Sequence, residues 1–203
     1  MDALIMAGGP GSRMGKGYEK PLIKVCGKPM VEWVVEAAVE SGAVSRIIVA
    51  VTEKTRRTGE AVAKLPVEVT KTPGLGYIED YKRAIKKLKL SEVLILPSDL
   101  PLIRGDTLRY VINCYRRSNK PALSVMVPLN VYKKLNLHPG YVFEVNGELV
   151  SPAGVNVMDG GKVDEERVEQ EVLIMEEEGL AVNVNAPKEL KLAERLMRKT
   201  RKF

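Results

Sequence analysis

A short apolar run that ends in glycines opens the sequence and limits the folds available to it. Residues 3–7 are all apolar, and Gly8-Gly9-Pro10-Gly11 follows them directly. Such a run predicts a buried first strand, and the glycines predict a tight loop whose backbone can approach a ligand closely. A strand that ends in a glycine loop is typical of α/β sheets, in which ligands bind beyond the carboxyl ends of the strands.

The rest of the chain alternates between expected strands and helices, which predicts one α/β domain over residues 1–203 with a mostly parallel central sheet. Asn146-Gly147, flanked by alternating residues over 141–150, predicts a β-hairpin. The other expected strands are 46–52, 67–69, 93–96, 122–127 and 154–158, and the apolar segment 180–184 precedes the last helix. The expected helices are 29–41, 54–64, 78–88, 106–117 and 187–198.

The net charge of +6 raises the question of a nucleic-acid partner. Residues 195–203 carry five of these charges and no acid, which leaves +1 for the rest of the chain. We therefore expect a solvated basic tail over 195–203. Because no basic stripe alternates with aromatic residues, we expect no nucleic-acid partner.

Targeting and metal-cluster signals are weak in this chain. No apolar run reaches the roughly 18 residues that a membrane helix needs, and the start lacks the basic region of a signal peptide. Cys26, Cys114 and the lone His138 give no Cys/His metal cluster. We expect a cytoplasmic protein with reduced thiols and no membrane partner.

The glycine loop fits neither of two common phosphate-binding motifs. The dinucleotide fingerprint G-x-G-x-x-G, started at Gly9, has Gly11 but meets Met14 at its third glycine. The Walker A pattern would place Pro10 at its first glycine and Gly17 at its hydroxyl position. The loop can still direct backbone N–H groups toward phosphates.

The segment from Leu4 to Met14, with Glu19-Lys20-Pro21-Leu22, resembles the N-terminal signature of nucleotidyltransferases. Stretches at 76–80, 98–100, 152–157 and 190–194 resemble, within them, the guanylyltransferases of cobalamin synthesis. The resemblance implies a three-layer Rossmann-like fold. It also implies transfer of GMP from GTP onto a phosphorylated acceptor, adenosylcobinamide phosphate, with release of pyrophosphate. A homodimer is compatible with it.

The resemblance also implies site residues. Lys20 would meet the α-phosphate, although most lysines are simply exposed on a surface, and Arg13 would share the catalytic work with it. Pro10 departs from the family pattern and removes a backbone donor from the loop. The loop residues that would hold the β- and γ-phosphates are Ala7, Gly8, Gly9, Gly11, Ser12 and Arg13.

Asp99 follows the apolar run 93–96, where a carboxylate can bind Mg²⁺ as a hard oxygen ligand. An aspartate at this position can instead cap a turn. Asn156 is the preferred second metal ligand, and Asp164 is a poorer candidate. The expected cofactor is therefore Mg²⁺.

Guanine presents two neighbouring N–H donors, so a carboxylate is its natural partner. Glu79 or Asp80 can serve, but either can equally be an acidic residue favoured by the helix dipole. Gly154 matches a stretch that lines the active site in the resembled family, and the alternative is a glycine required by a tight backbone turn.

Other functions stay open at this point. Within the class, the acceptor can be a molybdopterin or a sugar phosphate. A nicotinamide-dependent oxidoreductase is disfavoured by Met14, and a GTP-binding regulator would bind nucleotide without releasing pyrophosphate. His138 lies in a loop outside the motifs, so we expect it to be structural rather than a general base.

Overall fold

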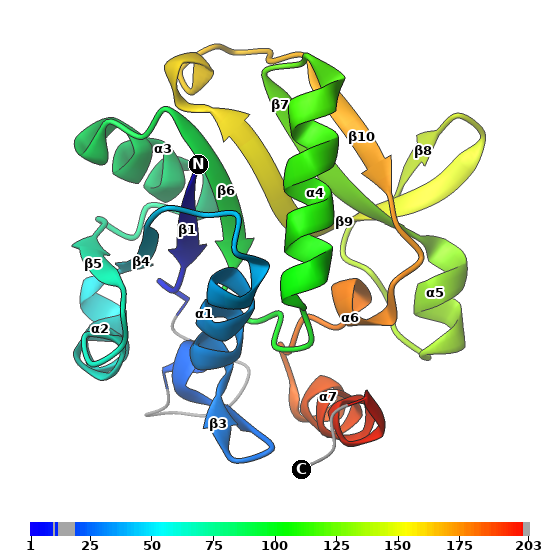
Figure 1. Cartoon of the computed structure of the whole chain (residues 1–203). Helices are drawn as coiled ribbons and strands as arrows, with labels where there is room; N and C mark the ends of the chain where they lie inside the picture. The colour runs from blue at the N-terminus through cyan, green and yellow to red at the C-terminus, as the bar shows by residue number, and fades with distance from the viewer. Residues whose placement is uncertain (10, 12–18, 201–203) are drawn as a thin grey trace.

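The computed structural model describes residues 1–9, 11 and 19–200, and a twisted central sheet runs through them (Figure 1). Its strand order is β10-β7-β9-β6-β1-β4-β5, and β8 pairs with β9. The strands are β1 (Asp2–Met6), β4 (Ile47–Val51), β5 (Glu68–Lys71), β6 (Glu92–Pro97), β7 (Ala122–Pro128), β8 (Phe143–Val145), β9 (Glu148–Asp159) and β10 (Gln170–Ile174).

The sheet is mostly parallel, as the sequence predicts. β1 pairs in parallel with β4 on one side and with β6 on the other, and Met6 lies opposite Pro97 in that register. The connections after β1 and after β4 lead away from β6, so the strand order reverses between β1 and β6. Crevices at such reversals are where open α/β sheets bind ligands. β9 is antiparallel to both neighbours.

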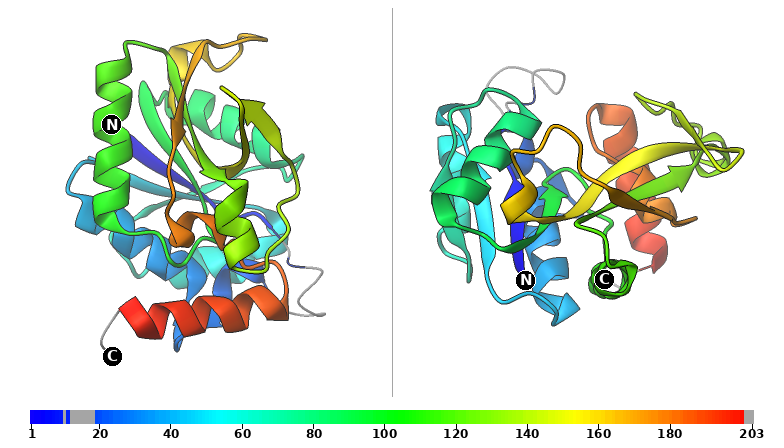
Figure 2. Two further views of the ribbon diagram at one scale, coloured as in Figure 1. Left: turned by 90° about the vertical axis from the view of Figure 1, so that its right-hand side faces the viewer. Right: turned by 90° about the horizontal axis from the view of Figure 1, so that it is seen from above.

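Helices cover both faces and complete a three-layer fold (Figure 2). On one face α1 packs against α4, and on the other face α3 lies over β4, β1 and β6. Among the described residues, no helix is long and apolar enough to cross a membrane. The helices are α1 (Met30–Ser41), α2 (Arg56–Val62), α3 (Tyr77–Leu88), α4 (Gly105–Ser118), α5 (Leu129–Lys134), α6 (Glu178–Ala181) and α7 (Pro187–Thr200).

The central strands are buried because both faces are covered, which explains their continuous apolar sequences. In β1, Ala3 and Ile5 belong to the larger core under α1 and α4, whereas Leu4 belongs to the smaller core under α3. The chain therefore buries two apolar layers, one on each side of the same sheet.

Several elements differ from the sequence-based expectations. The strand predicted at 154–158 is twelve residues long and contains a register shift opposite Ser124–Met126. β10 and α5 were not predicted, because their short segments show no clear period. The predicted hairpin at Asn146-Gly147 is confirmed.

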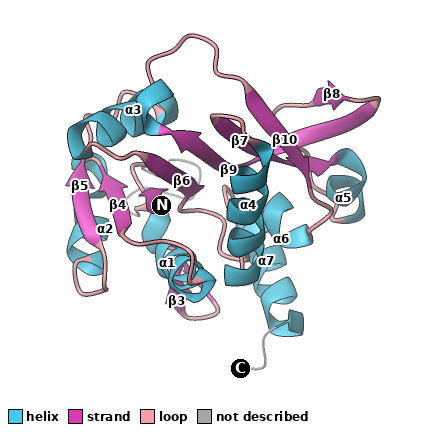
Figure 3. Cartoon of the chain, turned by 45° about the horizontal axis from the view of Figure 1, so that its top comes forward, coloured by secondary structure: helices cyan, strands magenta, loops and turns pink. Residues whose placement is uncertain are grey.

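The C-terminal basic stretch was expected to be a solvated tail that overlaps the end of the last helix. In the structure α7 runs to Thr200, where Arg195, Arg198 and Lys199 are exposed and Met197 is fully buried. Residues 201–203 lie outside the described part of the chain. The apolar stripe of α7 anchors this basic stretch to the domain (Figure 3).

Candidate active site

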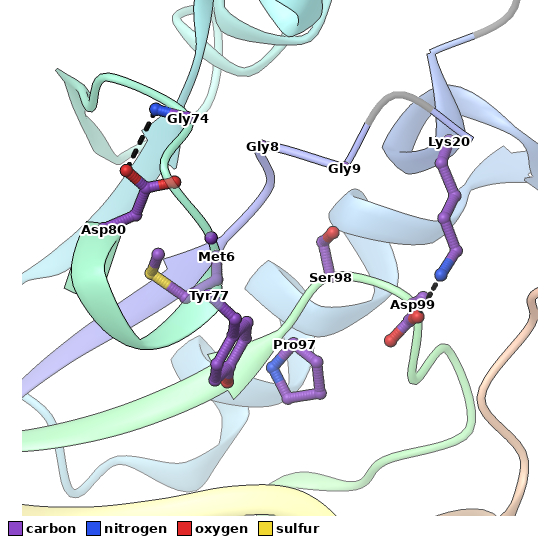
Figure 4. A pocket seen from close by; sticks show the side chains of 11 residues that line it. Met6, Gly8, Gly9, Lys20, Gly74, Tyr77, Asp80, Pro97, Ser98 and Asp99 are labelled. Atoms are coloured by element: carbon purple, nitrogen blue, oxygen red, sulfur yellow. Dashed lines mark hydrogen bonds and ion pairs between the residues drawn. The ribbon is translucent and has the colours of Figure 1, made fainter. Parts of the chain in front are cut away.

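A cleft of about 300 Å³ opens at the carboxyl ends of β1 and β6 (Figure 4). Its position matches the strand reversal described above. Its walls come from the loops after β1 and β6 and from the start of α3. The lining residues are Met6, Gly8, Gly9, Lys20, Gly74, Gly76, Tyr77, Asp80, Pro97, Ser98 and Asp99.

Lys20 and Asp99 form an ion pair at one end of the cleft, and each side chain is 15% exposed. Lys20 Nζ also donates to Asn185 Oδ1 at 2.6 Å, and Asn183 Nδ2 donates to the other carboxylate oxygen of Asp99 at 3.1 Å. One cation, one carboxylate and two amides therefore converge beside the glycine loop. The sequence analysis named Lys20 and Asp99 but missed Asn183 and Asn185.

The backbone fixes Asp99 from two sides. β6 ends at Pro97, and Ser98 N donates to Met6 O at 3.2 Å, which ties the loop after β6 to the end of β1. Val184 N donates to Asp99 O at 2.9 Å. Because Val184 is buried between Asn183 and Asn185, this bond brings both amides to Asp99. An N-V-N segment with a buried centre is the sequence signal that could have identified them.

Glu19, the residue before Lys20, is fixed by hydrogen bonds to the start of α2. Its carboxylate accepts hydrogen bonds from Arg57 N at 2.9 Å and from Thr58 N at 2.6 Å, at the start of α2. It also accepts from the Thr58 hydroxyl at 2.6 Å. A carboxylate at a helix N-terminus satisfies free N–H groups and complements the helix dipole. Glu19 thus anchors the end of the glycine loop next to Lys20.

The described part of the glycine loop has little room for side chains. A Cβ on Gly8 would lie 2.7 Å from Thr52 Cγ2. Gly11 has φ +72°, and a Cβ there would lie 2.8 Å from Lys20 Cβ. Ala7 is buried and donates from its N–H to Ala50 O at 2.8 Å, so it positions the loop. Pro10, Ser12 and Arg13 lie outside the described residues.

Glu79 and Asp80, the two candidates for contacting guanine, occupy different places. Asp80 is 5% exposed and lines the cleft, and its Oδ1 accepts from Gly74 N at 3.0 Å and Leu75 N at 3.3 Å. Glu79 lies outside the cleft lining and pairs with Arg83 at 2.9 Å. Of the two, only Asp80 is brought to the cleft.

Gly154 lies at the edge of the site, within the irregular part of β9. It has φ +81°, and a Cβ there would lie 3.2 Å from Pro97 Cγ. The Tyr77 hydroxyl donates to Gly154 O at 3.3 Å. Although 40% of Tyr77 is exposed, burial around its hydroxyl and the negative charge of Asp99 raise the pKa of Tyr77. The hydroxyl therefore stays protonated and remains a donor.

The structure does not bring Asn156 to Asp99. Asn156 lies in β9 opposite Ile95, inside the sheet, and its Oδ1 accepts from Ser124 Oγ at 2.8 Å. The pairing register of β9 sets the position of Asn156, and the spacing of residues in the sequence does not reveal that register. Asp164 pairs with Lys86 at 2.9 Å on the surface. In the described part of the chain, no three His, Cys, Asp or Glu residues cluster as metal ligands, and Asp99 is the carboxylate at the Lys20 end of the cleft.

Comparisons with known proteins show the family of the chain. Residues 3–140 match the family described as MobA-like NTP transferase domain. The adenosylcobinamide-phosphate guanylyltransferase of Methanocaldococcus jannaschii is 34% identical, and the match covers 98% of each chain. The bifunctional protein GlmU of Caldanaerobacter subterraneus is 40% identical over 54% of this chain and 24% of its own.

Solved structures show the same fold at low sequence identity. A CMP:2-keto-3-deoxy-manno-octonic acid synthetase complexed with CTP superimposes with a TM-score of 0.77 at 15% identity, over 98% of both chains. The three-layer architecture is therefore shared with this structure over almost the whole length of the chain.

Proposed function

Because the chain belongs to the family of MobA-like NTP transferases, we propose that it transfers GMP from GTP onto adenosylcobinamide phosphate and releases pyrophosphate. The observation that carries this proposal is the 34% identity to the guanylyltransferase over 98% of both chains. The cleft at the β1/β6 reversal supports it, because its glycine backbone and Lys20 suit a triphosphate.

In this proposal Lys20 and the glycine loop have different roles in the reaction. A phosphate oxygen of the acceptor attacks the α-phosphorus of GTP, and the bond to pyrophosphate breaks. Lys20 stabilises the charge that builds on the α-phosphate, and the glycine loop donates N–H groups to the leaving pyrophosphate. Arg13 and Ser12 of the loop are proposed to add donors there. A phosphate monoester has a second pKa of about 6, so no general base is required.

The donor set beside Lys20 fits a divalent cation, which we propose to be Mg²⁺. Mg²⁺ binds through one or two carboxylates together with substrate phosphates, and Asp99 with Asn185 Oδ1 would offer oxygen ligands. When bound, the cation supplies positive charge to the triphosphate. Lys20, which pairs with Asp99 here, would be free to pair with a phosphate if the cation took Asp99.

Guanine is proposed to lie against the loop that Asp80 holds, at the α3 end of the cleft. Asp80 fixes the backbone of Gly74 and Leu75, and a fixed backbone can hydrogen-bond a base selectively.

The free thiols Cys26 and Cys114 suit the reducing cytoplasm.

The proposal is tested by mixing the protein with GTP, Mg²⁺ and adenosylcobinamide phosphate and measuring pyrophosphate release. We expect stoichiometric formation of adenosylcobinamide-GDP, with GTP strongly preferred over ATP. A parallel series with sugar phosphates and molybdopterin serves as the control. Faster turnover with one of those acceptors would contradict the assignment of the acceptor while preserving the class.

A further inference from the structure

Thr52 lies where the end of β4 meets the glycine loop. It directly follows β4, is 4% exposed, and does not line the cleft. Its Oγ1 donates to Gly8 O at 3.2 Å and accepts from the backbone N–H of Thr55. Because a hydroxyl carries a single hydrogen, the bond to Gly8 occupies the donor of this side chain.

The bond from Thr52 fixes the peptide between Gly8 and Gly9. A trans peptide is planar, so its C=O and N–H groups point in opposite directions. With Gly8 O turned toward Thr52, Gly9 N–H points to the other side, where both glycines line the cleft between Met6 and Lys20 (Figure 4). Within the described residues no group accepts from Gly9 N, so in this part of the chain the donor is open to a ligand.

The segment that begins at Thr52 also holds the far end of the glycine loop. Thr52 caps the short 3-10 helix Glu53–Thr55, and α2 follows that helix directly. The first turn of α2 binds the Glu19 carboxylate through two backbone N–H groups and the Thr58 hydroxyl. Both described ends of the glycine loop are therefore fixed to one continuous segment, 52–58.

The methyl group of Thr52 has a separate place, between the glycine loop and the loop after β5. A Cβ on Gly8 would lie 2.7 Å from Thr52 Cγ2, and a Cβ on Gly74 would lie 3.4 Å from the same atom. The methyl therefore separates the two loops, whereas the hydroxyl orients the backbone of one of them. The two parts of the side chain can be tested independently.

We propose that Thr52 is a positioning residue for the pyrophosphate part of GTP, because its hydroxyl aims Gly9 N–H at the β- and γ-phosphates. This inference rests on the proposed function, in which the glycine loop holds the leaving pyrophosphate. Thr52 itself contacts no substrate. A backbone donor that is aimed before the ligand arrives binds an anion without reorganisation, and its hydrogen bond to a charged oxygen is a strong one.

Two substitutions separate the hydroxyl from the methyl. Thr52→Val keeps the shape of the side chain and removes the donor, whereas Thr52→Ser keeps the donor and removes the methyl. Thr72→Val is the matched control, because Thr72 is also buried and its hydroxyl donates to another backbone carbonyl, Val51 O, at 3.3 Å. Thr72 does not line the cleft.

Pyrophosphate and GMP are the two parts into which the reaction divides GTP, so they serve as the probes. Displacement of bound GTP, followed by calorimetry with Mg²⁺ and no acceptor, measures the dissociation constant of each. For Thr52→Val we expect the constant of pyrophosphate to rise about tenfold and that of GMP to stay within about twofold. Thr52→Ser and Thr72→Val should leave both constants within about twofold.

The ratio of the two constants separates positioning from stability. Thr52→Val also removes the cap of the helix 53–55, so its melting temperature should fall. A general loss of structure would weaken pyrophosphate and GMP together and leave their ratio unchanged. A change of the ratio in Thr52→Val that is absent from Thr52→Ser therefore reports the hydrogen bond to Gly8.

An unchanged pyrophosphate constant in Thr52→Val, or equal weakening of pyrophosphate and GMP, would overturn the inference and leave the proposed function intact. If Thr52→Val does not fold, Thr52→Ser decides: unchanged constants support the inference, and a tenfold rise for pyrophosphate with the hydroxyl still present contradicts it. A wild type that binds neither GTP nor pyrophosphate would overturn the proposed function, and this inference with it.

Discussion

The two sides of the cleft are built differently. On the side of β1 and α3, each feature has fixed partners: Asp80 holds two backbone N–H groups, Lys20 holds Asp99, and Glu19 caps α2. On the side of β9, the stretch from Val150 to Asn156 carries no charged side chain, and Gly154 O accepts a hydrogen bond from the Tyr77 hydroxyl. The first side therefore offers directed bonds and charge to a ligand, and the second offers an uncharged surface.

The strongest test of this difference is Asp99→Asn, which removes the negative charge that pairs with Lys20 on the first side. We expect turnover to fall on the order of 100-fold while GTP binding changes little, because the lost charge acts mainly on the transition state. Pyrophosphate release at saturating Mg²⁺ measures kcat, and calorimetry measures GTP affinity. Asp106→Asn, at an exposed side chain in the first turn of α4, is the control. Normal turnover in Asp99→Asn would show that the carboxylate only caps its turn.

A smaller effect, confined to the nucleotide side, is expected for Gly11→Ala. The new Cβ would meet Lys20 Cβ at 2.8 Å in a left-handed backbone, so Lys20 and the loop must shift. The KM for GTP should rise about tenfold, with the acceptor KM unchanged. Gly27→Ala is a matched control, because Gly27 has φ +84° but nothing within 4 Å of its Cβ. Equal losses in both variants would leave only backbone strain as the cause.

The pair Asp80→Asn and Glu79→Gln compares neighbouring carboxylates on one helix. Asp80→Asn weakens two hydrogen bonds to the 74–75 loop, so we expect GTP affinity to fall about fivefold to tenfold and the preference over ATP to narrow. Glu79→Gln breaks an exposed ion pair and should change affinity less than twofold. Titration with GTP and ATP measures both. A larger loss of GTP affinity in Glu79→Gln than in Asp80→Asn would place the guanine base outside the cleft.

Tyr77→Phe should give the smallest change, on the side of β9. Losing the bond to Gly154 should raise the acceptor KM about threefold to fivefold. The pKa of Tyr77 is raised above its ordinary value of 10, so its hydroxyl stays protonated up to pH 10. The pH–rate profile below pH 10 should therefore keep its shape. Tyr81→Phe, one turn further along α3, is the control. A limb of the profile that disappears in Tyr77→Phe would show that the hydroxyl titrates during turnover.

Local patterns predicted the elements around β1 and β6 well. The first strand, its glycine loop, Asp99 after β6 and the helices around them follow from short apolar runs and turn residues. Phosphate binding needs glycines and a cation close together in sequence, so the motif is local. The fold class is confirmed for the same reason, since alternating strands and helices leave few topologies.

The remaining part of the site depends on pairing between distant segments. β10 pairs in parallel with β7 and has an exposed glutamine at its start, so it carries no continuous apolar run. Asn183 and Asn185 reach Asp99 through Val184, and Asn156 is turned toward Ser124 by the register of β9. These positions are set by register and long connections, which local propensity does not specify.

The place of β9 in the sheet has a consequence for how the chain is made. β9 lies between β6 and β7, both of which precede it in the sequence. During synthesis, at about 5–20 residues per second, those two strands wait with unpaired edges until residue 159 has left the ribosome. Unpaired edges invite pairing with other chains. The segment with Asn183 and Asn185 is made after β9, so the nascent protein completes the polar cluster at Lys20 and Asp99 only after the central strands are in place.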